Sequence, residues 1–305
     1  MKKKDFVSIR DWATDELNEA LAAARAIKAD PAKYSRRLEG KALAMLLEKP
    51  SLRTRVTFDV GIHQLGGFSL CLTKAEINLG KREAVSDVAK NLERMVQGIM
   101  IRTFSHENVQ KMAEYASIPV INGLTDFSHP CQAMADYLTI LEVKGRFRDL
   151  KIAYIGDGNN VAHSLIFGAV RFGAHLAVAS PKGYEPNPEV VRWAEEHSGD
   201  AGSKLEIVED PVAAAEEADV IYTDVWASMG LESQAAERRQ IFHSYQVNDA
   251  LVRHAKADYI FMHCLPAHRG EEVSGSVIDS NHSVVFQQAE NRLHAQKAIL
   301  LALMG

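Results

Sequence analysis

Short apolar runs alternate with helical segments along almost the whole chain, and this alternation limits the possible folds more than any other feature. The run at 42–47 predicts a buried strand, and residues 56–65 then carry apolar side chains at roughly helical spacing. Further strands are predicted at 68–72, 98–103 and 118–124, and the apolar spacing over residues 12–38 predicts an amphipathic helical opening. Strands that alternate with helices favour parallel sheets covered by helices on both faces. The chain is therefore predicted to be an α/β protein.

The pattern restarts after a hinge-like segment at 145–149. A clear buried strand follows at 151–156, and strands and helices then alternate again to residue 263, with further strands predicted at 175–179, 205–208, 219–223 and 258–263. With 305 residues, the chain is long enough for two domains. We expect two domains, each a parallel β-sheet flanked by helices: residues 1–147, with the C-terminal helix at 288–305 packing back on them, and residues 148–287.

Composition and charge exclude several classes of protein. A formal net charge of -5 argues against a general nucleic-acid binder. The start Met1-Lys2-Lys3-Lys4 has no apolar segment after it, so no signal peptide is expected, and no apolar run approaches membrane-spanning length. Three scattered cysteines are too few for a disulfide framework or a zinc site. We therefore expect a reduced, cytoplasmic location and no membrane or nucleic-acid partner.

The stretch from Glu48 to Arg55 is the first candidate binding site. It lies where the strand at 42–47 gives way to a helix, and a helix start offers free N–H groups and a partial positive charge. Hydroxyls and guanidiniums in the same stretch are donors suited to phosphate. Ser51 taken alone is more often a simple N-cap, and the glycines of a P-loop are missing. A phosphate-bearing small molecule is the predicted ligand.

Other polar side chains follow strands or open helices in the rest of the first domain. Arg102 is placed at the carboxyl end of a strand, where open α/β sheets bind ligands, although a lone arginine more often caps a helix or pairs on the surface. His129 and Gln132 lie three residues apart at a helix start and can face one pocket. A lone histidine is more often structural. Arg292 lies near the start of the apolar terminal helix.

The second domain opens with Gly156-Asp157-Gly158-Asn159-Asn160. This partial glycine motif lacks its third glycine, and no acidic residue ends the next strand, so it counts against NAD. Two asparagines at a helix start suit a carboxylate instead. Asp224 follows a strand and could hold an ammonium group, or could equally be a turn residue.

Cys264 follows the last strand of this domain and admits two interpretations. A free cysteine is most often a small buried apolar residue. A cysteine–histidine hydrolase is disfavoured, because the neighbouring His263 in a strand would point to the opposite face.

Together these motifs resemble the aspartate/ornithine carbamoyltransferase family, and its ornithine branch in particular. Ser51-Leu52-Arg53-Thr54-Arg55 is similar to the family's Ser-Thr-Arg-Thr-Arg motif, and His129-Pro130-Cys131-Gln132 to its His-Pro-x-Gln motif. Asp224 with Ser228-Met229-Gly230, and His263-Cys264-Leu265-Pro266, resemble the two ornithine-type signatures. The resemblance covers nearly the whole chain, in order and at family spacing.

The resemblance implies an activity, an assembly and a set of site residues. The activity is transfer of the carbamoyl group of carbamoyl phosphate to the δ-amine of L-ornithine, giving L-citrulline and phosphate, in a homotrimer with sites between subunits and no metal or organic cofactor. The carbamoyl phosphate site would comprise Ser51, Leu52 (through its main chain), Arg53, Thr54, Asn78, Arg102, His129, Gln132, Cys264, Leu265 and Arg292. The ornithine site would comprise Asn160, Asp224, Ser228 and Met229. Arg102, His129, Asp224 and Cys264 would take part in catalysis, Cys264 by positioning the amine and not as a nucleophile.

Two departures and two alternatives accompany this interpretation. Leu52 replaces a threonine of many members, and Asn78 replaces a glutamine. The acceptor could be another amine, such as putrescine or an acylated ornithine. A non-catalytic two-domain binding protein of periplasmic type is the alternative from another class. Domain closure over the substrates is expected, with residues 228–240 as the lid.

Overall fold

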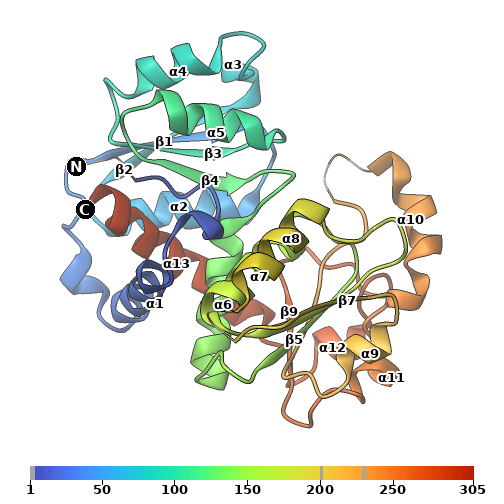
Figure 1. Cartoon of the computed structure of the whole chain (residues 1–305). Helices are drawn as coiled ribbons and strands as arrows, with labels where there is room; N and C mark the ends of the chain where they lie inside the picture. Colours follow the sequence, from blue (N-terminus) through green and yellow to red (C-terminus); the bar gives the residue numbers. More distant parts are fainter. Residues whose placement is uncertain (1–3, 200–201, 229, 231) are drawn as a thin grey trace. The chain divides into compact units, whose positions relative to one another are not determined.

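The computed structural model describes residues 4–199, 202–228, 230 and 232–305. The chain divides into two compact units, Met1–Leu138 with Glu290–Gly305, and Thr139–Ala289. Each unit contains one parallel sheet flanked by helices, so the predicted α/β fold with two parallel sheets is confirmed (Figure 1). In the described part of the chain, no helix is both long and apolar enough to cross a membrane.

The first unit is built on a four-stranded sheet of order β2-β1-β3-β4. All pairs are parallel, and the register sets Leu47 beside Arg102 and Arg102 beside Leu124. The carboxyl ends of three strands therefore meet at one edge. The strands are β1 (Ala42–Leu47), β2 (Phe68–Thr73), β3 (Gly98–Arg102) and β4 (Val120–Leu124). The helices are α1 (Thr14–Ala29), α2 (Leu52–Gln64), α3 (Lys74–Ile77), α4 (Val85–Leu92), α5 (His106–Tyr115) and the start of α6 (Pro130–Lys144), with 3-10 turns at Ile9–Asp11 and Pro31–Tyr34.

Helices cover both faces of this sheet (Figure 1). On one face, Ala44 of β1 and Ile99 of β3 join a buried apolar cluster with Val88 of α4 and Met112 of α5. On the other face lie α2 and the C-terminal helix α13 (Val285–Met304). Burying each large aliphatic side chain stabilises the fold by roughly 2 kcal/mol.

The C-terminal helix returns to the first unit, as the sequence predicts. Residues from Glu290 onward belong to that unit, and Lys297 donates a hydrogen bond of 2.9 Å to the side chain of Gln64 in α2. A side chain at Gly98, the first residue of β3, would lie 2.7 Å from the sulfur of Met304. The flexible end of the Met304 side chain would have to shift to admit a Cβ there, which shows how closely the end of α13 approaches the strand.

The second unit is built on a five-stranded parallel sheet of order β7-β6-β5-β8-β9. The register sets Ile155 beside Thr223 and Thr223 beside His263, so three strands again end together. In Figure 1, α7 and α8 lie on one face and α9, α11 and α12 on the other. The strands are β5 (Lys151–Ile155), β6 (His175–Ala179), β7 (Leu205–Val208), β8 (Val220–Thr223) and β9 (Ile260–His263). The helices are α7 (Asn160–Phe172), α8 (Pro188–His197), α9 (Pro211–Ala215), α10 (Ala235–Ile241), α11 (Asp249–Val252) and α12 (Gly275–Ile278), with 3-10 turns at Glu232–Gln234 and His243–Tyr245.

Two elements of the first unit differ from the sequence interpretation. The apolar spacing over 12–38 predicts one helix, but α1 ends at Ala29 and a separate 3-10 turn begins at Pro31. Proline lacks an N–H and cannot continue the ladder of a helix interior, so the break falls there. Helix α5 is not recognised from the sequence, although Ser105 is its N-cap and accepts the N–H of Asn108 at 3.3 Å.

Candidate functional site

The predicted phosphate-binding stretch is the N-terminus of α2. Ser51 has an extended backbone, with φ −163° and ψ 119°, and its hydroxyl accepts the N–H of Thr54 at 3.1 Å. Ser51 is therefore an N-cap. The other first-turn N–H groups have no partner within the helix, and together with its dipole they favour an anion. The side chain of Leu52 is 74% exposed, which agrees with a role for its main chain alone.

Two arginines converge on the hydroxyl of Thr54. Arg292 donates to it at 2.7 Å, and Arg102 lies within 3.4 Å of it at the end of β3. All three side chains are buried. Two guanidiniums meet at one hydroxyl here, and two buried positive charges close together favour binding of an anion.

His129 lies buried directly before α6, in the field of these cations. Burial holds the pKa of its imidazole well below its ordinary value, and the positive charges of Arg292, Arg102, Arg53 and Lys49 lower it further. The ring is therefore neutral at neutral pH, and can donate one hydrogen bond without adding a charge. One cationic cluster thus contains His129 together with the predicted phosphate-site residues of α2, β3 and α13.

Gln132 and Asn78 are placed differently. Gln132 is buried in α6 and donates to Asp136 at 2.8 Å, while its carbonyl oxygen has no hydrogen-bond partner within the described ranges. A carbonyl in this position could accept from an amide of a ligand. Asn78 caps α3 in the left-handed conformation, with φ 41°, and its carbonyl accepts the N–H groups of Lys81 and Arg82. Its main chain shapes a turn, and a role for its side chain stays a prediction.

Lys49 is a residue of this cluster that sequence reasoning missed. Its side chain is buried, pairs with Asp126, and lies 4.1 Å from the ring centre of Phe104. The available signal was its place in the Glu48–Arg55 stretch, but a lysine before a proline is more often a surface residue.

The acceptor candidates of the second unit gather at the ends of β5, β8 and β9. Asp224 is buried and accepts the thiol hydrogen of Cys264, with 3.0 Å between Sγ and Oδ1. Its other oxygen accepts from the side chain of Asn159 at 2.9 Å. The strand register explains this meeting, because Thr223 and His263 are neighbours and their successors follow side by side. Cys264 and Leu265 therefore lie in the second unit with Asp224.

Asn159 and Asn160 have different positions and contacts at the start of α7. Asn159 is the N-cap of α7 and accepts the N–H groups of Val161 and Ala162 at 2.8 and 3.3 Å, besides contacting Asp224. Asn160, the predicted ligand, is the first residue of α7 and is largely buried. Ser228 is half-buried after β8. Met229, also predicted to bind ornithine, lies outside the described residues.

Arg238 of α10 connects the loops around these acceptor residues. Its buried guanidinium donates to the carboxylate of Asp157 at 2.8 Å and to the carbonyl of Trp226 at 2.7 Å. It also lies 4.9 Å from the ring centre of Tyr184. Three loops that follow β5, β6 and β8 thus share one cation. Sequence reasoning missed it, because Arg238 lies inside the predicted lid at 228–240; movement of that lid stays a prediction.

The side chain of His263 forms contacts of its own within the second unit. It is fully buried, its Nδ1 accepts the N–H of Leu265 at 2.8 Å, and its Nε2 lies 3.2 Å from Glu272. With these partners it orders the main chain after β9. The prediction that His263 points away from Cys264 is wrong, because a ring nitrogen lies within 4.8 Å of the cysteine sulfur. What argues against a base for a nucleophilic cysteine is that Leu265 and Glu272 already engage the two ring nitrogens.

Among the residues that the structure describes, two groups of side chains have the donor atoms of a metal site. Ligand atoms lie within 4.8 Å of one another in the group Asp224, His263 and Cys264, and in the group His268, Glu271 and Glu272. In both groups, contacts within the protein already engage the donors: Cys264 bonds Asp224, and Glu271 pairs with Arg239 at 3.0 Å. The geometry is thus explained by protein contacts alone.

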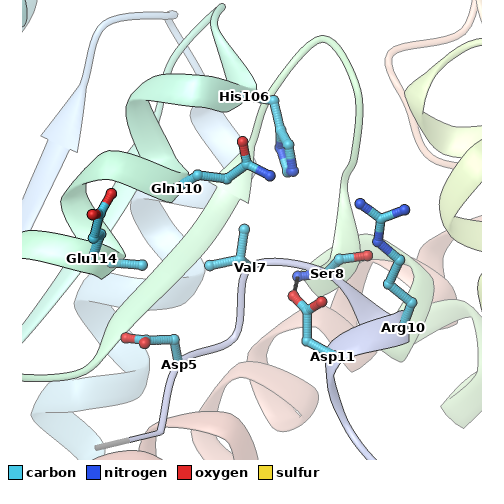
Figure 2. Close-up of a pocket in the computed structure, with 9 residues that line it drawn as sticks. Asp5, Val7, Ser8, Arg10, Asp11, His106, Gln110 and Glu114 are labelled. Carbon is cyan, nitrogen blue, oxygen red and sulfur yellow. Dashed lines mark hydrogen bonds between the residues drawn. The ribbon is translucent and has the colours of Figure 1, made fainter.

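A separate pocket of about 360 Å³ lies between the N-terminal segment and α5 (Figure 2). Its wall carries both signs of charge, including Asp5, Arg10 and Glu114, and Asp11 accepts the N–H of Ser8 at 2.8 Å. None of the predicted site residues lines it.

Comparison with known proteins yields two family matches that together span most of the chain. Residues 4–142 match the carbamoyl-P binding domain of the aspartate/ornithine carbamoyltransferases, and residues 148–303 match their Asp/Orn binding domain. A relative from Thermococcus kodakarensis named ornithine carbamoyltransferase is 57% identical over 304 residues, which are 99% of this chain and 96% of the relative. One from Pyrococcus furiosus, named ornithine carbamoyltransferase, anabolic, is 53% identical with the same coverage.

Solved structures agree with these matches over the full length. The ornithine carbamoyltransferase of Pyrococcus furiosus superposes with a TM-score of 0.96 at 53% identity, covering 99% of this chain and 97% of that one. The enzyme of Thermus thermophilus gives a TM-score of 0.89 at 42% identity, covering 99% of both. Sequence, fold and the order of the motifs thus lead to one conclusion: the chain belongs to the aspartate/ornithine carbamoyltransferase family.

Proposed function

We propose that the chain transfers the carbamoyl group of carbamoyl phosphate to the δ-amine of L-ornithine, giving L-citrulline and phosphate. The observation that carries this proposal is the buried cationic cluster around Thr54 and His129, beside the N-terminus of a helix. It is suited to a small phosphate ester with a polar carbonyl. Relatives named ornithine carbamoyltransferase, one of them anabolic, support ornithine as acceptor and a biosynthetic direction.

Within the proposed carbamoyl phosphate site, one set of residues is proposed to bind the phosphate and another set the carbamoyl group. Ser51, the main chain of Leu52, Arg53, Thr54 and Arg102 hold the phosphate. The carbamoyl group is held by His129, Gln132, Arg292 and the main chain of Cys264 and Leu265, with Asn78 as a further contact. The residue types fit, because guanidiniums and hydroxyls donate to phosphate and the neutral imidazole can donate to a carbonyl oxygen.

The chemistry follows from these donors. A neutral amine attacks the carbonyl carbon, and the carbon–nitrogen bond forms to give a tetrahedral oxyanion. The carbon–oxygen bond to phosphate then breaks, and the departing phosphate takes the proton that the attacking nitrogen loses. A primary amine has a reference pKa of about 10.4, so ornithine must lose a proton before it attacks. Thr54, Arg102 and His129 are proposed to donate to the oxyanion, and loss of one such donor typically costs about 3 kcal/mol. Arg53 and the helix start stabilise the departing phosphate.

The acceptor half is proposed to recognise the amino-acid end of ornithine. Asp224 would bind the α-ammonium group and Asn160 the α-carboxylate, with Ser228 and Met229 completing the site. Cys264, hydrogen-bonded to Asp224, would position the reacting amine. Putrescine lacks the α-groups, and these residues would then have no partner on it. A site with such polar groups rejects a ligand that leaves them unpaired.

The chain is also proposed to act as a homotrimer in the cytoplasm, with residues 1–147 and 288–305 binding carbamoyl phosphate and 148–287 binding ornithine. An apolar stripe supports self-association. Leu52, Val56 and Val60 recur at helical spacing on α2 and are 74%, 47% and 39% exposed, and Phe68 and Leu70 on the edge strand β2 are 49% and 48% exposed. Exposed apolar patches mark interaction surfaces. Light scattering of a Val56→Glu variant tests whether this surface holds the assembly.

The test of the activity is turnover of carbamoyl phosphate with ornithine, putrescine, acetylornithine and aspartate offered separately. Turnover of ornithine alone supports both halves of the site. Turnover of another amine alone would overturn the acceptor half and keep the carbamoyl phosphate half. Binding of carbamoyl phosphate with no turnover of any amine would favour a binding protein.

A further inference from the structure

The carboxylate of Glu48 joins two segments that are distant in the sequence. Its Oε1 accepts the N–H of Leu79 at 2.8 Å, across 31 residues. Its Oε2 accepts the hydroxyl hydrogen of Thr103, across 55 residues. The main-chain N–H of Glu48 also donates to the carbonyl of Arg102 at 2.9 Å. Glu48 itself follows β1, so one residue connects the ends of two strands with the turn after α3.

Each of these connections lies next to a predicted ligand of carbamoyl phosphate. Glu48 is three residues before Ser51, Leu79 follows Asn78, and Thr103 follows Arg102. Glu48 thus lies at the junction of three segments that supply this half of the site, although nothing in the family resemblance assigns it a role.

Both partners of the carboxylate are themselves fixed. Leu79 is 5% exposed and packs in the apolar cluster of the first sheet. Thr103 is 1% exposed, and its N–H donates to Leu124 at 3.0 Å. The turn that begins at Asn78 is closed by main-chain hydrogen bonds of its own. The N–H of Gly80 donates to the carbonyl of Glu83, and the N–H of Lys81 donates to the carbonyl of Asn78. Because Leu79 and Thr103 are both held in place, the carboxylate that bonds both of them fixes the positions of their two segments relative to each other.

The carboxylate of Glu48 accepts both hydrogen bonds of the junction, one from a backbone N–H and one from a hydroxyl. Glutamine could keep both contacts, because its oxygen can accept from Leu79 while its amide donates to the hydroxyl oxygen of Thr103, but neither bond would then have a charged acceptor. Hydrogen bonds to an ionised acceptor are also about twice as strong as neutral ones.

We infer that Glu48 is a positioning residue for carbamoyl phosphate: its carboxylate sets the turn of Asn78 and the end of β3 with Arg102 against the helix start at Ser51. The inference rests on the proposed function for its choice of ligand. It places Glu48 outside direct contact with the substrate.

The experiment compares three variants of the full chain. Glu48→Gln removes the charge of the shared acceptor and so weakens both bonds, and Thr103→Val removes one bond while keeping the shape of the side chain. Glu83→Gln is the matched control, because it neutralises an exposed carboxylate of the same turn that bonds only Asn91 in the structure. Calorimetry measures the Kd of carbamoyl phosphate without an acceptor, and steady-state kinetics gives the KM of each substrate.

The expected result is a rise of about tenfold in the Kd and KM of carbamoyl phosphate for Glu48→Gln and for Thr103→Val, as for loss of one charge-assisted hydrogen bond. The Kd of carbamoyl phosphate should rise no further in the double variant than in the more strongly affected single variant, because both substitutions act on one junction. The KM of ornithine at saturating carbamoyl phosphate should not change, and Glu83→Gln should match the wild type.

A lower unfolding temperature with unchanged Kd would show that the junction only stabilises the fold, and would overturn the inference. Should Glu48→Gln fail to fold, Thr103→Val decides by the same criterion. Wild-type binding of carbamoyl phosphate without citrulline formation would overturn the proposed function but leave the Kd comparison valid. Absence of carbamoyl phosphate binding by the wild type would overturn both.

Discussion

Arg292 donates a hydrogen bond of 2.7 Å to the hydroxyl of Thr54, although 238 residues separate them. The bond forms because α13 returns to the first unit and brings a guanidinium to the start of α2. Arg102 approaches the same hydroxyl from β3. The last helix therefore supplies a residue of the buried cationic cluster and is not only a covering of the sheet.

Thr54→Val tests this shared acceptor. The change keeps the shape of the side chain but leaves both guanidiniums without the hydroxyl, so their geometry around a bound phosphate should loosen. We expect carbamoyl phosphate to bind about tenfold more weakly, as for a lost hydrogen bond to a charged group. Calorimetry measures the effect, with Thr57→Val, in the next turn of α2, as the control. Equal affinity of Thr54→Val and wild type would count against the cluster.

The buried histidine predicts a pH dependence of stability. The pKa of His129 in the folded chain is well below its ordinary value, whereas in the unfolded chain it is about 6.5. Below that pH the unfolded chain takes up a proton that the folded chain does not, so stability should fall as the pH drops from about 6.5. The slope from one such group is at most about 1.4 kcal/mol per pH unit.

Denaturant unfolding of wild type and His129→Asn between pH 7.5 and pH 5, a span of ~2.5 units, checks this expectation. The variant should lose part of the slope and keep the contribution of His294, whose pKa burial also lowers. Identical slopes would mean that His129 is accessible to protons in the folded chain.

Cys264→Ala tests the role of the thiol. If Cys264 positions the amine through its bond to Asp224, the variant should retain measurable turnover, with kcat lowered by about ten- to a hundredfold. Mass spectrometry of acid-quenched wild-type enzyme should find no carbamoyl group on Cys264. A trapped S-carbamoyl group (a thiocarbamate) would instead identify Cys264 as a nucleophile.

Arg238→Lys tests the connection of the acceptor loops. Lysine keeps the charge but cannot reach Asp157 and Trp226 together in the planar geometry of a guanidinium. The KM of ornithine should rise several-fold while the Kd of carbamoyl phosphate stays the same, because Arg238 belongs to the second unit. Equal changes for both substrates would indicate a general loss of structure.

The positions of the strands along the chain are the part of the fold that the sequence predicts best, whereas their order within each sheet is not predicted. The runs at 42–47, 175–179 and 205–208 are strands with the predicted bounds, because each is a short apolar run between breaks. Helix α5 was missed, since its sequence is polar and only two of its residues are buried. The end of α1 was missed because the apolar spacing continues past Pro31.

The residues of the candidate site also differ in how far the sequence alone indicates them. Residues within local motifs, such as Ser51 and His129, could be found because neighbouring residues signal them. Glu48, Lys49 and Arg238 could not, because their partners lie far away in the sequence and no local spacing predicts those contacts. Tertiary register alone brings them together.

Formation of the carbon–nitrogen bond is the most direct test of the account. Carbamoyl phosphate labelled with carbon-13 is incubated with ornithine labelled with nitrogen-15 at the δ-position, and carbon–nitrogen coupling is followed by NMR, with an enzyme-free sample to measure spontaneous carbamoylation. The account predicts enzyme-dependent coupling between the carbamoyl carbon and the δ-nitrogen, with release of phosphate. Coupling no faster than in the enzyme-free sample, or label recovered only as bicarbonate, would contradict it.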